Sequence, residues 1–199
     1  MSVDLNRRNF LLHAGTGTVA LAGASVWAGM ASSPAAADDG QEGIGFFFAA
    51  LDSAGPVHTP ASPDALLMQG CGHFDPHSGE IMASGFFVHY DGSSPLSPKP
   101  IKATGFWRAR RLESFDQGPR FGVQLTGIMV ADVELLRQSP QPETVIPAEL
   151  TVVCNSPAIP FSTGEDEGFQ LVVGNLSFMP LSPTVGISGF DDQSLAEDE

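Results

Sequence analysis

Basic side chains are scarce in this chain, which has 9 Lys and Arg residues against 23 Asp and Glu residues. Proteins that bind nucleic acid or anionic lipid neutralise phosphate groups with Lys and Arg, so we expect neither partner. Such an acidic chain suits a saline medium, where ions screen its self-repulsion. An ordinary acidic exported protein is the alternative, and the composition leaves both open.

Long apolar runs are missing as well. A membrane-spanning helix needs about 20 strongly apolar residues. The segment at residues 11–30 is only mildly apolar because Gly and Thr interrupt it. We therefore expect no stable membrane anchor, although an uncleaved N-terminal anchor remains the alternative.

Motifs for catalysis and for phosphate binding are absent. The chain has no G-x-S-x-G elbow, no P-loop and no dinucleotide-binding fingerprint. We predict no cofactor, and we expect binding rather than catalysis, with enzymatic activity left open.

Only two cysteines occur, Cys71 and Cys154. A single disulfide between them is one expectation for an exported protein. Two thiols that are buried as small apolar side chains are the alternative.

The N-terminus resembles a twin-arginine (Tat) signal peptide. Arg7 and Arg8 are followed after one residue by Phe10 and Leu11, although Asn6 and Leu12 replace the usual flanking Ser/Thr and Lys. An A-x-A-like site at residues 35–37 predicts cleavage after residue 37. The resemblance implies recognition by the Tat translocase and export to the periplasm or the extracellular space.

The remaining residues predict one all-β domain at residues 38–190, followed by a disordered acidic tail at residues 191–199. Aromatic and β-branched runs alternate with Gly, Pro, Ser and Asp clusters, which is typical of strands and turns. We predict about eight antiparallel strands, at residues 43–51, 65–74, 80–90, 100–115, 120–136, 145–154, 168–180 and 184–190.

An up-and-down β-barrel is favoured over a β-sandwich because short connections join the first five predicted strands. Glycines recur inside these strands, at Gly72, Gly85, Gly105 and Gly127. A glycine inside a strand weakens it, so their repetition predicts bends or bulges in a coiled sheet.

The segments "GHFDPHSG", "GFFVHYD" and "ATGFWRARR" resemble an uncharacterised family of small exported β-rich bacterial proteins. This resemblance covers about half of the chain, implies an all-β fold and transfers no catalytic residue. The eight-strand outline is similar to lipocalin and allene oxide cyclase barrels in architecture alone.

Six of the seven basic residues after position 37 lie within residues 99–120. Strand alternation places Phe106, Arg108 and Arg110 on one face, where they would bind a carboxylate or phosphate if that face lines the barrel. The alternative is that these arginines face solvent and pair with Asp132 and Glu134 on the next strand.

His89 and Asp91 share a strand face, where they can serve as an acid–base pair. A structural role is favoured instead, because Asp91 precedes a glycine and such aspartates usually cap turns.

The segment at residues 71–80 contains three weak metal-ligand candidates, His73, Asp75 and His77. Period-two spacing would place them on one strand face. Proline follows Asp75 and glycine stands at position 79, however, so a reverse turn is favoured and no metal is predicted.

These residues support three functional hypotheses. The first is a barrel that binds a small anionic or apolar ligand through His89, Phe106, Arg108 and Arg110. The second is a cyclase or isomerase that uses His89 with Arg108 or Arg110 inside the barrel. The third is a structural or surface-interaction protein, which a contiguous exposed aromatic patch would favour.

Overall fold

The computed structural model describes residues 43–56, 64–92, 98–155 and 163–192. The signal-peptide prediction therefore lies outside the described residues. The described part is all-β and contains eight strands: β1 (Ile44–Pro56), β2 (Ala65–Phe74), β3 (Ile81–Tyr90), β4 (Ile101–Phe121), β5 (Gln124–Ser139), β6 (Thr144–Cys154), β7 (Gly168–Val173) and β8 (Leu176–Asp192).

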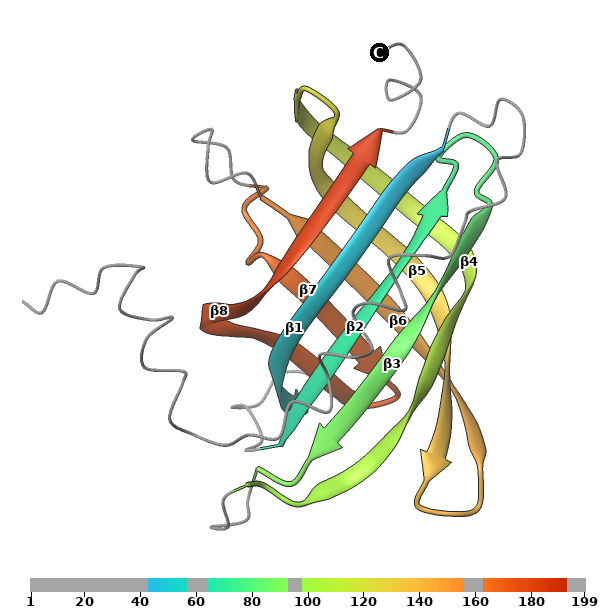
Figure 1. The fold of residues 1–199 in the computed structure, drawn as a ribbon, viewed down its shortest axis with the longest axis vertical. Coiled ribbons are helices and arrows are strands. Elements are labelled where there is room, and N and C mark those ends of the chain that lie inside the picture. The colour runs from blue at the N-terminus through green and yellow to red at the C-terminus, as the bar shows by residue number, and fades with distance from the viewer. Residues whose placement is uncertain (1–42, 57–63, 93–97, 156–162, 193–199) are drawn as a thin grey trace, which may run out of the picture. The chain divides into compact units, whose positions relative to one another are not determined.

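The strands form one closed antiparallel barrel in which each strand pairs with its neighbours in sequence and β8 pairs with β1 (Figure 1). The predicted up-and-down barrel is thus confirmed. Among the described residues, no helix is long and apolar enough to cross a membrane.

Two predicted strand divisions are wrong. The segment predicted as one strand at residues 120–136 contains the turn between β4 and β5, where Gly122 has a φ of 62°. The segment predicted at residues 168–180 likewise contains the turn between β7 and β8, where Gly174 has a φ of 61°. Positive φ is readily available to glycine, so both hairpins turn there.

The last strand also continues beyond the predicted domain boundary at residue 190. Asp191 pairs with Gly45 of β1, and Asp192 pairs with Ile44. Arg120 of β4 forms an ion pair with Asp192. The remaining predicted tail, residues 193–199, lies outside the described residues.

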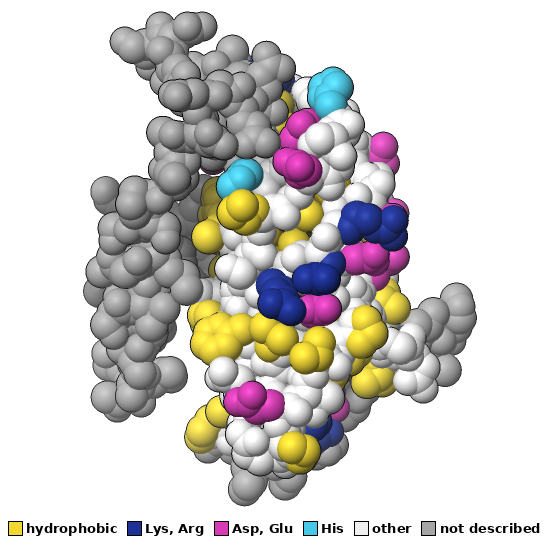
Figure 2. All heavy atoms as spheres, turned by 90° about the vertical axis from the view of Figure 1, so that its right-hand side faces the viewer, with side chains coloured by type: hydrophobic (Ala, Val, Ile, Leu, Met, Phe, Trp, Pro, Cys, Tyr) yellow, Lys and Arg dark blue, Asp and Glu magenta, His cyan; other side chains and the backbone are white. Residues whose placement is uncertain are grey.

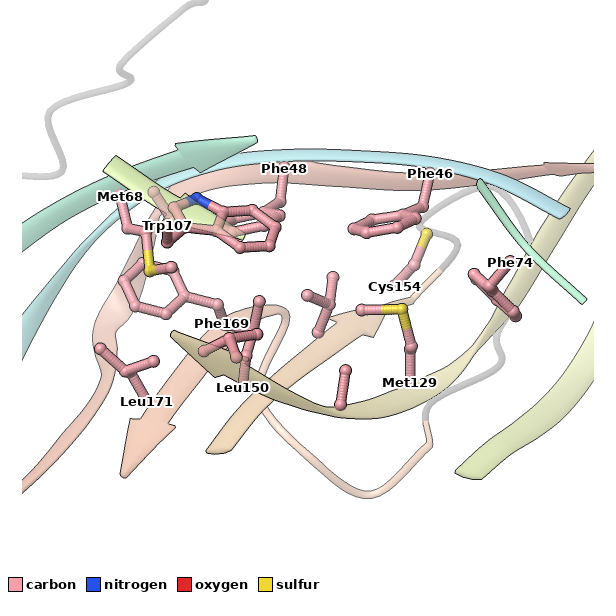
Figure 3. Close-up of a cluster of buried hydrophobic side chains, with 14 of the residues drawn as sticks. Phe46, Phe48, Met68, Phe74, Trp107, Met129, Leu150, Cys154, Phe169 and Leu171 are labelled. Atoms are coloured by element: carbon pink, nitrogen blue, oxygen red, sulfur yellow. The ribbon is translucent and has the colours of Figure 1, made fainter. Parts of the chain in front are cut away.

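Apolar side chains fill the barrel interior (Figure 3). Side chains alternate between the two sides of each strand, so every second residue points inward. The largest fully buried side chains include Trp107, Phe48, Phe169 and Met68. The ring of Phe48 lies 5.7 Å from the Trp107 ring and 5.5 Å from the Phe169 ring, between centroids.

Bulges in β4 bend this strand over one end of the barrel. Its pairing with β5 shifts register between Ala109 and Arg111, between Leu112 and Ser114, and again before Arg120. A bulge adds a residue to one strand and increases the local bend.

This bend carries Phe115 of β4 inward. Its ring lies 4.9 Å from the Phe74 ring and 5.2 Å from the Phe190 ring, between centroids. Leu125 of β5 then pairs with Phe190 of β8. Aromatic side chains therefore pack that end of the barrel.

Candidate functional site

The outer side of β3–β6 carries a row of apolar side chains. Phe86 pairs with Phe106, Phe106 pairs with Leu136, and Leu136 pairs with Val145. Each lies next to an inward-facing residue, so alternation directs all four outward. We call these four residues the apolar row.

The apolar row is accessible to solvent. Phe106 is 51% exposed and Val145 is 56% exposed, whereas Phe86 and Leu136 are half-buried by their neighbours. Figure 2 shows hydrophobic side chains forming a band across this face, beside a cluster of basic and acidic side chains. Removing such apolar surface from water is favourable, so covering it would stabilise a complex.

Ion pairs border one side of the apolar row. The Arg108 Nη2 atom lies 2.7 Å from an oxygen of Glu134, and the Arg110 Nε atom lies 3.4 Å from the other oxygen. Both arginines are more than half exposed. The expectation that Arg108 and Arg110 share a face is confirmed, and that face is the outer one.

Arg111 also points outward, although strict alternation would place it on the side opposite to Arg110. The bulge between Ala109 and Arg111 inserts an extra residue and reverses the alternation. Arg111 forms ion pairs with Glu113 and, at 3.1 Å, with Asp132. The alternative that Arg108 and Arg110 face solvent is the one observed. Their acidic partner is Glu134, whereas Asp132 pairs with Arg111.

His89 lies on the inward side of β3. It is near the end of the barrel opposite to the one packed by Phe74, Phe115 and Phe190. Its Nε2 atom is 3.2 Å from Asp64, which directly precedes β2, and its ring packs edge-on against Phe178 of β8. Lys102 Nζ lies 2.8 Å from Asp64 and 3.6 Å from Asp91. These four polar side chains form an ion-paired group at the barrel end.

Burial alone would raise the pKa of the Asp64 carboxyl. Hydrogen bonds from Lys102 and from His89 outweigh burial and hold that pKa below its usual value. Asp64 is therefore a carboxylate at neutral pH and serves as the shared acceptor of this group.

His89 contacts Asp64, and Asp91 contacts Lys102. His89, Arg108 and Arg110 do not converge. His89 faces the interior while both arginines lie on the outer surface, so the barrel wall separates them. The structure provides no shared site for the acid–base chemistry that the second hypothesis requires.

Two of the weak metal candidates belong to a turn, as the turn interpretation predicts: Asp75 begins it and His77 lies within it. The backbone N–H of His77 donates to the Asp75 carboxylate at 2.7 Å, and the N–H of Gly79 donates to the Asp75 carbonyl oxygen. Hydrogen bonds from Ser78 and His77 lower the Asp75 pKa. His73 belongs to β2, before this turn. In the described ranges, no three His, Cys, Asp or Glu side chains gather as a metal site.

Cys71 and Cys154 are free, so the disulfide alternative is contradicted. Cys71 is exposed on the outer side of β2, whereas Cys154 points into the core from β6 (Figure 3). Their side chains therefore lie on opposite sides of the barrel wall and do not have the geometry that a disulfide needs.

A groove of about 270 Å³ lies on the outer side of β5–β8. Thr151, Gln170 and Met179 contribute to its lining, and Glu165 and Asp166 lie at its rim. Both carboxylates are exposed, so bulk water competes with any ligand there. We base no function on this groove.

Phe86, Leu136 and Val145 were not among the residues predicted to form a site. Alternation shows which neighbours share a strand face, but cross-strand alignment depends on register. Asp64 was not predicted either, because its contact with His89 joins residues that are 25 positions apart.

The chain matches no protein-family model, no curated protein and no solved structure in the comparisons made.

Proposed function

We propose that this protein is an exported, non-catalytic surface-interaction protein that binds its partner through the outer face of β3–β6. The single observation that carries the proposal is the apolar row, an exposed aromatic and aliphatic band that crosses four strands. Contiguous apolar surface on a small soluble domain is characteristic of interaction sites. Export rests on the Tat-like signal at residues 1–37.

The filled barrel favours an external site over an internal one. Ligand-binding barrels hold their ligands in an open interior. Here Trp107, Phe48 and Phe169 occupy the middle of the barrel, and Phe74 and Phe190 pack against Phe115 near its end. Binding of a small ligand in the interior would require these aromatic side chains to move.

The aromatic side chain of Phe106 is expected to contribute much of the binding free energy. Phe106 sits near the middle of the apolar row, where a partner would exclude water from it most completely. Aromatic residues in such central positions carry a large share of binding energy in protein interfaces. The bordering Arg108–Glu134 pair forms the polar rim that such interfaces usually have.

Site-specific photo-crosslinking in cells that export the chain tests this proposal. A photoreactive phenylalanine analogue at position 106 should form a covalent adduct of defined mass. The same analogue at position 187 provides the matched control, because Ile187 is also 51% exposed but lies on β8, outside the apolar row.

An adduct that forms from position 106 and not from position 187 supports the proposed function, whatever its mass. Illumination that yields no adduct at position 106, in a protein that is folded and exported, contradicts it.

A further inference from the structure

The charges around the apolar row nearly cancel, although the whole chain is strongly acidic. Two ion-paired groups lie beside the row: Arg108 and Arg110 with Glu134, and Arg111 with Glu113 and Asp132. Glu149, which pairs with Asp132 across β5–β6, is exposed on the same outer face. Together they contain three basic and four acidic side chains. This part of the surface is therefore almost neutral.

The rest of the described chain carries most of the negative charge. The described ranges contain 16 acidic and 7 basic residues. The residues beside the row account for three of those seven basic residues and for only four of the acidic ones. Two copies of the chain consequently repel each other least when they approach through β3–β6.

We infer that the partner of the apolar row is a second copy of this chain, held in a two-fold dimer that lays one row against the other. This inference rests on the proposed function, because it uses the same surface. A two-fold contact is self-complementary, so one apolar row suffices for both copies. A strongly basic partner would instead be drawn toward the acidic remainder of the surface.

The ion pairs support the same arrangement. Glu134 accepts from both Arg108 and Arg110, and the two arginines remain more than half exposed. Each copy therefore brings guanidinium groups to the rim with N–H donors that a neighbouring carboxylate can accept. The rim of a dimer can satisfy these donors without burying an unpaired charge.

The salt dependence of the affinity distinguishes a dimer from a complex with an oppositely charged partner. The electrostatic term that opposes association through a nearly neutral apolar face is the long-range repulsion of the two acidic copies. Raising NaCl from about 0.1 M to about 1 M shortens the screening length from about 10 Å to about 3 Å. The dimer should therefore become several-fold tighter, whereas binding to an oppositely charged partner would weaken.

Sedimentation velocity of the purified chain over residues 38–199 tests the inference. We expect a monomer–dimer equilibrium that shifts toward dimer with added salt. Phe106→Ser and, separately, Val145→Ser should weaken dimerisation by about tenfold or more. Ile187→Ser should leave it unchanged, because Ile187 is comparably exposed on β8 but lies outside the row.

Far-UV circular dichroism and Trp107 fluorescence confirm that each variant is folded. A chain that stays monomeric in both salt concentrations overturns the inference, as does a dimer that Ile187→Ser weakens as much as Phe106→Ser. In either case an adduct from position 106 to a different protein would leave the proposed function standing. An adduct of twice the chain mass supports both.

Discussion

Glu167, the residue before β7, illustrates how one side chain depends on its neighbours. Its carboxylate lies 3.5 Å from the Ser188 hydroxyl, and the Ser188 hydroxyl also donates to the Val153 carbonyl oxygen at 2.7 Å. Burial raises the pKa of Glu167, and hydrogen bonds from Ser188 offset this only in part. The ionised form is thus less favourable in the folded protein than in the unfolded chain.

Glu167→Gln should therefore stabilise the protein at neutral pH. A carboxyl with a raised folded-state pKa contributes stability below its unfolded-state pKa and loses it as pH rises through the folded-state pKa. The amide avoids this loss and still offers an oxygen to Ser188. Urea denaturation at pH 7 should give the variant a higher midpoint than the natural chain.

The advantage of Glu167→Gln should shrink as the pH falls below the ordinary range of a glutamate, because the natural side chain is then protonated in both states. Asp166→Gln is the matched control, since Asp166 is exposed and adjacent. If Glu167→Gln stabilised the protein equally at acidic and at neutral pH, ionisation of Glu167 would not be the cause.

At the scale of elements, β2, β3 and β4 depend on two glycines that accommodate one tryptophan. Gly70 pairs with Gly85 across β2–β3, and Gly85 pairs with Trp107 across β3–β4. The indole lies over both glycines, and its Nε1 donates to the Gln69 carbonyl oxygen at 2.8 Å. The absence of a side chain at these two glycines makes room for the indole. For Gly85, this is a reason for glycine in addition to the bend predicted from the sequence.

Gly85→Ala should destabilise the fold by about 1–3 kcal/mol, the usual range for overpacking. Its Cβ atom would overlap the Gln69 carbonyl oxygen and lie 2.5 Å from Trp107 Nε1. Trp107 is the only tryptophan after residue 37, so its fluorescence during urea unfolding reports on this site directly.

Ser84→Ala serves as the control for Gly85→Ala because Ser84 is the neighbouring, exposed position on β3. Its stability should change by less than about 0.5 kcal/mol. Equal stability of the two variants would show that Gly85 does not make room for the indole.

In the molecule as a whole, the barrel wall places its two cysteines in different environments. β2 and β6 are opposite each other in the ring of eight strands. Cys71 is exposed on the outside of β2, while Cys154 is buried on the inside of β6. Burial, together with the nearby charge of Glu167, raises the pKa of the Cys154 thiol.

Titration of the folded chain over residues 38–199 with a thiol reagent should therefore detect one fast thiol, which belongs to Cys71. The second thiol, that of Cys154, should react only after the chain has been unfolded. No reducing agent should be needed to make it react. Cys71→Ser should abolish the fast reaction and leave the slow one. Finding no thiol in the unreduced, unfolded chain would instead indicate a disulfide and contradict this fold.

The all-β class, the approximate strand number and the turn after Phe74 could be predicted from the amino-acid sequence. These are local properties: strand composition, period-two alternation, and the Asp, Pro and Gly chemistry of a reverse turn. Alternation also showed correctly that Phe106, Arg108 and Arg110 share one face.

Whether that face is the inner or the outer one depends on the folded barrel. Alternation distinguishes two sides of a strand, but closure of the barrel around Trp107 makes one of them the interior. Register then aligned Phe106 with Leu136, and a bulge turned Arg111 outward. Because register, bulges and closure arise from packing between distant segments, the apolar row exists in the folded barrel and in no single stretch of the chain.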